Sequence, residues 1–176
     1  MGTGDTWLKD FVRDIPDFPK PGVVFKDITP LLADPRAFHH SIDALADHFA
    51  DRKIDKVLGV EARGFIIAAP IAYRFGAGFV PVRKVGKLPW QVHRQQYLLE
   101  YGADALEIHN DALAEGEQTL IIDDVLATGG TASAAAQLVE RLGGKVTGVG
   151  FVIELGFLAG RGKLEGYDAV SLVEYA

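Results

Sequence analysis

The sequence contains no cysteine and only one methionine among its 176 residues. Without cysteine the chain cannot form disulfide bonds, use thiolate catalysis or build a thiolate zinc site. No uninterrupted apolar run reaches the roughly 18 residues of a membrane-spanning helix. The first residues, from Met1 to Trp7, show neither a basic segment nor an apolar core, so no signal peptide is expected. These absences predict a cytoplasmic protein.

Basic residues are the minority among the charges. The 18 Lys and Arg residues against 24 Asp and Glu residues leave a formal net charge of −6. An acidic balance argues against a nucleic-acid-binding protein, which usually presents a basic face. Hydrophobic residues make up 48% of the chain, enough for a substantial core, so disorder is not expected. A chain of this length typically buries about 70% of its unfolded surface, and residues 1–176 are expected to form a single domain.

Apolar runs and turn residues predict strands that alternate with helices. Helices are expected after Asp34-Pro35 as far as Phe49, at 65–75 and at about 131–142. Strands are expected at 56–60, 78–82, 97–101, 105–109, 120–122, 145–155 and 169–173. Strands that alternate with helices form parallel βαβ units. The sequence therefore predicts an α/β fold with a mostly parallel twisted sheet flanked by helices.

The two ends of the chain fall outside this alternation. Leu8, Phe11, Val12 and Ile15 have helical spacing and predict a short helix that stops before Pro16. We expect about residues 1–34 and 155–176 to pack together as a small hood over the open end of the sheet.

The most informative motif is a buried strand that leads into two carboxylates and a run of small residues. It reads Leu120-Ile121-Ile122-Asp123-Asp124-Val125-Leu126-Ala127-Thr128-Gly129-Gly130-Thr131. Open α/β sheets bind ligands at the carboxyl ends of their strands, where this acidic pair stands. The small residues allow backbone N–H groups to approach an anion closely, and Thr131 is expected to cap the helix that follows. The carboxylates are suited to bind hydroxyls, and the neighbouring N–H groups are suited to bind phosphate. Together they predict a sugar-phosphate site.

A second turn, Gly59-Val60-Glu61-Ala62-Arg63-Gly64-Phe65, repeats the order of apolar strand, polar turn and helix start. It is expected to lie beside the first turn. Arg63 carries a planar, permanently charged group suited to phosphate oxygens, which predicts a second phosphate site. The alternative for Arg63 is a structural salt bridge at a helix start.

Five basic residues crowd one further loop, namely Arg83, Lys84, Lys87, His93 and Arg94. They indicate a local basic patch, with a solvated charged loop as the alternative. The polar stretch from Lys84 to about Gln96 is predicted to act as a lid that shields a reactive sugar from water.

Two other phosphate-binding motifs are absent. No Gly-x-Gly-x-x-Gly sequence follows a strand, so the dinucleotide-binding fingerprint is missing. Gly162-Lys163 has Leu164 where a P-loop needs Ser or Thr, and Phe157 where the first glycine belongs.

The motif at 120–131 closely resembles the phosphoribosyl-pyrophosphate signature of the type I phosphoribosyltransferases. Over nearly its full length the chain also resembles the adenine-specific branch of that family. The matching segments, whose order and spacing carry the resemblance, are Pro21-Gly22-Val23-Val24-Phe25-Lys26-Asp27-Ile28, Glu61-Ala62-Arg63-Gly64-Phe65, Arg83-Lys84 with Gly86-Lys87-Leu88-Pro89, Leu99-Glu100-Tyr101-Gly102, and Glu154-Leu155.

The resemblance implies a type I phosphoribosyltransferase fold and a homodimeric enzyme of purine salvage. Such an enzyme joins adenine to phosphoribosyl pyrophosphate and forms AMP and pyrophosphate with Mg²⁺. The metal is implied to be held mainly by the substrate, with no direct protein ligand. A water-mediated contact to Asp123 or Asp124 is left open.

The resemblance also implies a role for each site residue. The ribose hydroxyls contact Asp123 and Asp124, and the ribose phosphate contacts Ala127, Thr128, Gly129, Gly130 and Thr131. Pyrophosphate is held by Arg63, Arg83, Lys84 and Lys87. Adenine is sandwiched by Phe25 and Leu155, with backbone groups around Val24 to Lys26 reading its edge. Glu100 assists proton movement at the base, with Tyr101 beside it, so the implied catalytic residues are Glu100, Arg63 and Tyr101.

Two alternatives stay open. A six-oxo-purine phosphoribosyltransferase would read the oxo group with a side-chain lysine, and no obvious counterpart follows the signature helix. A regulator that senses phosphoribosyl pyrophosphate and binds nucleic acid would need an added domain or a broad basic face. The chain departs from the family pattern at Lys26, where arginine is common, and at Gln96, where a small hydroxyl residue is frequent.

Overall fold

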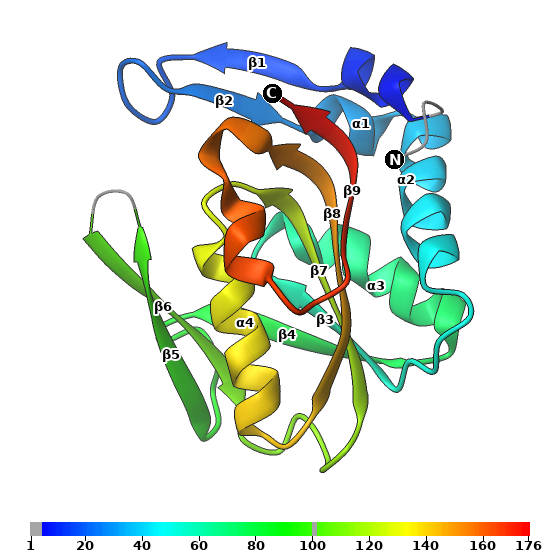
Figure 1. Ribbon diagram of the computed structural model, residues 1–176, viewed down its shortest axis with the longest axis vertical. Coiled ribbons are helices and arrows are strands. Elements are labelled where there is room, and N and C mark those ends of the chain that lie inside the picture. Colours follow the sequence, from blue (N-terminus) through cyan, green and yellow to red (C-terminus); the bar gives the residue numbers. More distant parts are fainter. Residues whose placement is uncertain (1–4, 100–101) are drawn as a thin grey trace.

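The computed structural model describes residues 5–99 and 102–176 and contains a seven-stranded sheet in the order β5-β6-β4-β3-β7-β8-β9 (Figure 1). Strands β3, β4, β7, β8 and β9 are mutually parallel, whereas β6 runs antiparallel to both β4 and β5. The sheet strands are β3 (Lys56–Val60), β4 (Gly78–Lys84), β5 (Val92–Leu99), β6 (Gly102–His109), β7 (Gln118–Leu126), β8 (Lys145–Leu155) and β9 (Ala169–Tyr175). The predicted α/β fold with a mostly parallel sheet is confirmed.

Helices cover both faces of this sheet. The α-helices are α1 (Thr29–Ala33), α2 (Pro35–His48), α3 (Arg63–Phe75) and α4 (Gly130–Arg141), and the short 3₁₀ helices are η1 (Thr6–Phe11), η2 (Gly156–Leu158) and η3 (Gly160–Leu164). The expected helix starts and stops are largely observed. Asp34 accepts a hydrogen bond from the Ala37 N–H at the start of α2, and α3 ends at Gly76 in the left-handed conformation.

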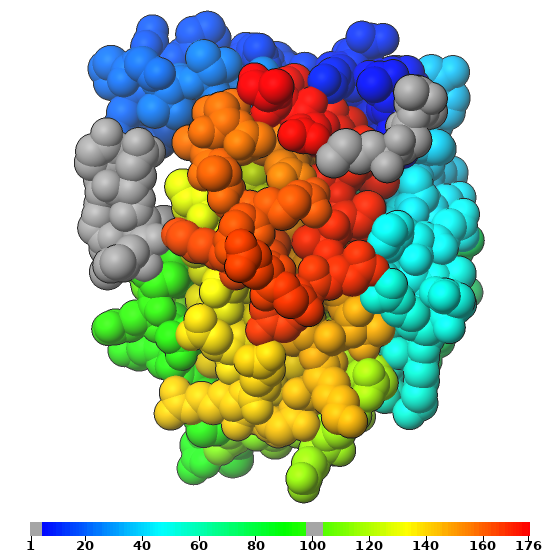
Figure 2. Space-filling view, in the orientation of Figure 1, coloured from blue at the N-terminus to red at the C-terminus, as the bar shows by residue number. Residues whose placement is uncertain are grey.

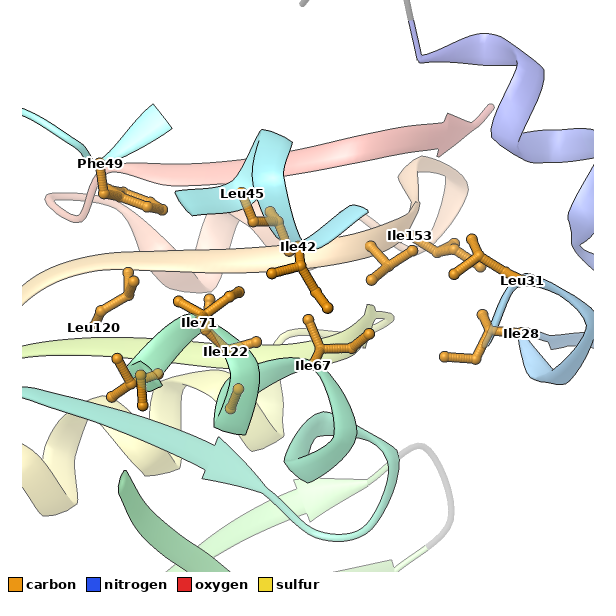
Figure 3. Close-up of a cluster of buried hydrophobic side chains, with 14 of the residues drawn as sticks. Ile28, Leu31, Ile42, Leu45, Phe49, Ile67, Ile71, Leu120, Ile122 and Ile153 are labelled. Carbon is orange, nitrogen blue, oxygen red and sulfur yellow. The ribbon is translucent and has the colours of Figure 1, made fainter. Parts of the chain in front are cut away.

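Strand β7 separates two hydrophobic clusters because successive side chains point to opposite faces. Leu120 and Ile122 pack with α2 and α3, as the close-up in Figure 3 shows. Ile121 packs in the second cluster with the alanine-rich α4. All three side chains are fully buried, and each contributes about 1.5–3 kcal/mol by leaving water. This burial anchors the strand in the core and so fixes the position of Asp123 and Asp124 at its end.

The N-terminal segment differs from the prediction. The helix expected from Leu8 to Ile15 is wrong in its second half, because η1 ends at Phe11 and Arg13 begins a strand. The strand β1 (Arg13–Pro16) pairs antiparallel with β2 (Val24–Asp27), so its backbone groups bond across the hairpin instead of along a helix. Among residues 5–99 and 102–176, no helix is long and apolar enough to cross a membrane.

The β1–β2 hairpin lies across the end of the sheet at which β8 and β9 finish (Figure 1). Leu8, Ile28 and Leu31 are buried in the same cluster as Ile153 and Val173, so the two ends of the chain share a core. The space-filling view shows the N-terminal segment in blue directly above the orange and red C-terminal region (Figure 2).

The basic loop is shorter than predicted. Val92 to Gln96 were expected in a loop, but they pair with β6, with Val92 opposite His109 and Gln96 opposite Ala105. Only residues 85–91 remain between β4 and β5. The second part of the lid predicted from Lys84 to Gln96 is therefore strand, because Val92 to Gln96 pair with β6, whereas residues 85–91 remain a loop.

Candidate active site

The two polar turns meet at one edge of the sheet. Strands β3 and β7 are parallel neighbours, with Lys56 opposite Thr119 and Gly59 opposite Ile122, so both end on the same side. A cleft of about 420 Å³ opens there. Its lining comes from both turns, the segment 23–26, the β5–β6 arm and the last residues of β4, β8 and η2: Val23, Val24, Phe25, Lys26, Val60, Glu61, Arg63, Lys84, Tyr97, Asp104, Leu106, Asp123, Asp124, Val125, Ala127, Thr131, Leu155 and Leu158.

The acidic pair is almost entirely removed from solvent. Asp123 and Asp124 are each 7% exposed, and the Asp124 N–H donates to Asp123 Oδ1 at 2.8 Å. A Cβ atom on Gly64 would lie only 2.9 Å from the same oxygen, so glycine there lets α3 begin against the carboxyl group. Burial raises the pKa of Asp123 well above its usual value, and the negative charge of Asp124 raises it further. Asp123 is therefore harder to ionise than an aspartate exposed to solvent.

Arg63 joins this acidic pair to the aromatic wall of the cleft. Its Nε donates to Asp124 Oδ2, and its Cζ lies 5.0 Å from the centroid of the Phe25 ring. The alternative of a salt bridge at the helix start is thus realised, although Arg63 also lines the cleft. One cation contacts both the predicted ribose-binding and the predicted adenine-binding residues.

The small-residue turn leads into α4 without a side-chain cap. Gly129 is the N-cap, with φ = 75°, and no side chain bonds to the first turn. The prediction that Thr131 caps this helix is wrong, because the helix already begins at Gly130 and Thr131 lies within its first turn. Uncapped N–H groups at a helix N-terminus form a ready anion site. Thr131 and Ala127 line the cleft, whereas Thr128, Gly129 and Gly130 do not.

Of the basic residues in the predicted patch, only Lys84 lines the cleft. Arg83 instead donates to the Glu61 carboxylate from Nε (3.2 Å) and Nη2 (3.0 Å), and from Nη1 to the Lys87 carbonyl oxygen at 3.1 Å. Arg94 pairs with the buried Glu107 at 2.6 Å. The proposed contacts of Arg83 and Lys87 with pyrophosphate remain predictions.

Three polar residues that sequence reasoning missed also line the cleft, namely Glu61, Tyr97 and Asp104. Tyr97 and Asp104 stand opposite each other on β5 and β6, and the Tyr97 hydroxyl lies 3.3 Å from Asp104 Oδ2. The same oxygen lies 3.3 Å from Lys84 Nζ. The register of the hairpin brings these side chains together, and a single sequence does not reveal that register.

Glu61 connects the two strands that border the cleft. Besides Arg83, it accepts the Lys84 N–H at 3.0 Å, so a side chain of the β3–α3 turn holds the end of β4. The hydrogen bond from Arg83 lowers the pKa of Glu61 and outweighs the opposing effect of burial. Its position within the segment 61–65 was the only sequence signal that could have indicated this role.

Replacing Glu61 with glutamine is expected to raise KM about tenfold for phosphoribosyl pyrophosphate, the substrate that the sequence resemblance implies, the equivalent of about 1.4 kcal/mol. The charged acceptor that fixes Arg83 and the Lys84 backbone is lost, so Lys84 is less well placed for an anion. Steady-state kinetics of the single variants and the E61Q/R83Q double variant measure the effect. If the increase in KM of the double variant equals the product of the increases in the two single variants, the contact between Glu61 and Arg83 is not their common cause.

The remaining predicted residues divide into two groups. Val24, Phe25, Lys26 and Leu155 all line the cleft. The ammonium group of Lys26 contacts Asp14 at 2.6 Å and lies 4.1 Å from the centroid of the Tyr175 ring. Glu100 and Tyr101 lie outside the described residues.

Comparisons with known proteins agree with this geometry. The family model of the phosphoribosyl transferase domain matches residues 27–171. An adenine phosphoribosyltransferase of Solibacter usitatus is 61% identical over 168 residues, which cover 96% of this chain and 97% of that protein. The chain belongs to the adenine phosphoribosyltransferase family. Its sheet order and flanking helices are those of a type I phosphoribosyltransferase.

Solved structures support this membership. The crystal structure of adenine phosphoribosyltransferase from Thermoanaerobacter pseudethanolicus is 56% identical, with a TM-score of 0.93, and the match covers 96% of this chain and 98% of that one. The enzyme from Saccharomyces cerevisiae is 42% identical, with a TM-score of 0.88 and coverage of 94% and 96%. Its structure is a complex with an imino-altritol bisphosphate and adenine.

Proposed function

We propose that this protein transfers the phosphoribosyl group of phosphoribosyl pyrophosphate to adenine, yielding AMP and pyrophosphate in purine salvage. The observation that carries the proposal is the convergence of two kinds of site in one cleft. The acidic pair Asp123–Asp124 and the uncapped start of α4 face the same space as Phe25 and Leu155. A sugar phosphate and a flat apolar base can therefore lie side by side. Adenine in the complex of the yeast relative supports the choice of base.

The reaction breaks the bond from the anomeric carbon to pyrophosphate and forms a bond from that carbon to a nitrogen of adenine. Positive charge develops on the ribose and negative charge on the leaving group. Asp124 is placed to stabilise the cationic ribose and to accept its hydroxyls, as carboxylates do in glycoside chemistry. Asp123 lines the cleft beside it and accepts the Asp124 N–H at 2.8 Å, which holds the Asp124 backbone.

The other groups bind the two ends of the substrate. In this proposal the N–H groups of residues 127–131 hold the ribose phosphate at the start of α4. Arg63 and Lys84 hold the pyrophosphate, and both line the cleft. Phe25 and Leu155 sandwich the base, and Glu100 takes up the proton that the base releases.

Magnesium belongs to the proposal as a partner of the substrate. Carboxylate oxygens such as those of Asp123 and Asp124 suit Mg²⁺, which usually keeps several waters and binds substrate phosphates. Within residues 5–99 and 102–176, no three His, Asp or Glu side chains gather closely enough to hold a metal ion. Asp123 and Asp124 would contact a Mg²⁺ ion carried by the pyrophosphate, and the ion would supply positive charge to the leaving group. The homodimer and the cytoplasmic location remain predictions.

The decisive experiment measures pyrophosphate release by the purified protein with phosphoribosyl pyrophosphate and Mg²⁺. Adenine, hypoxanthine and guanine are compared as acceptors, and only adenine is expected to support rapid turnover. Faster consumption of hypoxanthine or guanine would establish the six-oxo-purine alternative. Salt-dependent binding of RNA or DNA without turnover of any base would favour the regulator.

A further inference from the structure

A segment far from the signature in sequence presses against the proposed phosphate-binding turn. Gly160, the first residue of η3, is buried directly behind Ala127 and Gly129. A Cβ atom on Gly160 would lie 2.0 Å from the Ala127 carbonyl oxygen and 2.8 Å from the Gly129 nitrogen. A Cβ atom on Gly129 would lie 2.2 Å from the Gly160 carbonyl oxygen. The two backbones touch, and neither position has room for a side chain.

The segment around Gly160 is held in place from both sides. Arg161 donates to the buried Glu154 on β8, to the Ala169 carbonyl oxygen at 2.6 Å and to the Ser171 hydroxyl on β9 at 3.3 Å. At the other end of η3, Leu164 is 2% exposed and packs in the cluster that contains the alanines of α4. Because Arg161 is tied to the buried Glu154 and Leu164 is itself buried, Gly160 has little freedom to move away from the turn.

We propose that Gly160 is a positioning residue for phosphoribosyl pyrophosphate, although no predicted motif contains it. Its backbone acts as a fixed backing that sets the shape of the turn from Ala127 to Gly129, and therefore the directions of the N–H groups that hold the ribose phosphate. This inference rests on the proposed function of that turn. It assigns part of the phosphate site to the C-terminal region, only five residues beyond the adenine-lining Leu155.

The test compares two glycines of the same short helix. At Gly160 an added methyl group overlaps backbone, whereas a Cβ atom on Gly162 meets nothing within 4 Å. Because a misplacement of about 1 Å can cost up to about a hundredfold in rate, G160A is expected to raise KM for phosphoribosyl pyrophosphate at least about tenfold. In G160A, KM for adenine is expected to change by less than about twofold, since only the turn is displaced. G162A is expected to match the wild type in both KM values.

A binding measurement separates this inference from the proposed activity. Calorimetry with ribose 5-phosphate needs no turnover, and G160A is expected to bind it at least about tenfold more weakly than G162A. If the wild type binds this compound without using adenine, the proposed function fails while the inference stands. Equal affinities in the two variants, or equal increases in both KM values of G160A, would overturn the inference.

A second variant covers the case in which G160A does not fold. R161K keeps a positive charge beside Glu154 but cannot make all the contacts of the guanidinium group to Ala169 and Ser171. It is expected to weaken ribose 5-phosphate binding relative to G162A, because η3 is then held less rigidly against the turn. Unchanged affinity in R161K would contradict the proposal.

Discussion

Replacing Asp124 with alanine is expected to lower kcat/KM for phosphoribosyl pyrophosphate by about 10²–10³, the size of effect seen when one preorganised electrostatic group is removed. The carboxylate lies at the end of β7, is 7% exposed and faces the cleft. Its loss removes the negative charge nearest the proposed ribose cation. It also releases Arg63, whose Nε bonds to Asp124 Oδ2. Steady-state pyrophosphate release at saturating adenine measures the effect.

A matched Asp–Arg pair outside the cleft provides the control. Asp43 on α2 bonds to Arg74 at 2.9 Å, and its side chain is 61% exposed. Exposed ion pairs contribute only about 0–1 kcal/mol, so D43A is expected to retain activity within about twofold. Near-normal turnover in D124A, with thermal stability equal to that of D43A, would remove Asp124 from the proposed mechanism.

Replacing Asp123 with asparagine is expected to stabilise the folded protein at neutral pH while lowering turnover at least about tenfold. Burial and the charge of Asp124 raise the pKa of Asp123, so the folded state keeps a proton that the unfolded state has already released. Stability of the wild type therefore falls as pH rises above the ordinary value of 3.8, until the folded state also ionises. Asparagine does not ionise, so the stability of D123N relative to the wild type increases with pH over this range.

Thermal unfolding between pH 4.5 and pH 8 measures this difference, since each 1 kcal/mol shifts Tm by about 2–4 °C in a domain of this size. Asp27 offers a control of opposite sign. The Thr29 N–H lowers the pKa of Asp27, so its carboxylate stabilises the fold above its usual pKa and D27N is expected to lose stability at neutral pH. Parallel Tm curves for D123N and the wild type would show that Asp123 ionises without penalty in the folded state.

The site was predictable where its signal is local. The run from Leu120 to Thr131 encodes a strand, an acidic pair and a helix start within twelve consecutive residues, and each step follows from residue size and polarity. The same holds for the turn at 59–65. Because both strands are parallel, their ends meet at one edge of the sheet, and that meeting was also predictable.

The prediction failed where distant contacts compete with local preference. Val12 and Ile15 have helical spacing, yet Arg13 to Pro16 form a strand because β2 supplies hydrogen-bond partners. Val92 to Gln96 are polar enough for a loop, yet they pair with β6. Thr131 is a good capping residue in isolation, but the N-cap is Gly129, so the helix starts two residues earlier than a threonine cap would require.

By itself, the sequence determined the fold class, the edge of the sheet that carries the cleft and the acidic pair that lines it. Those features depend on neighbours along the chain. Only the tertiary structure decided that Glu61 holds Arg83, that Tyr97 and Asp104 share one side of the cleft and that Gly160 supports the turn at 127–129. Each of these contacts joins residues brought together by strand register or by close backbone packing, and neither leaves a pattern in a single sequence.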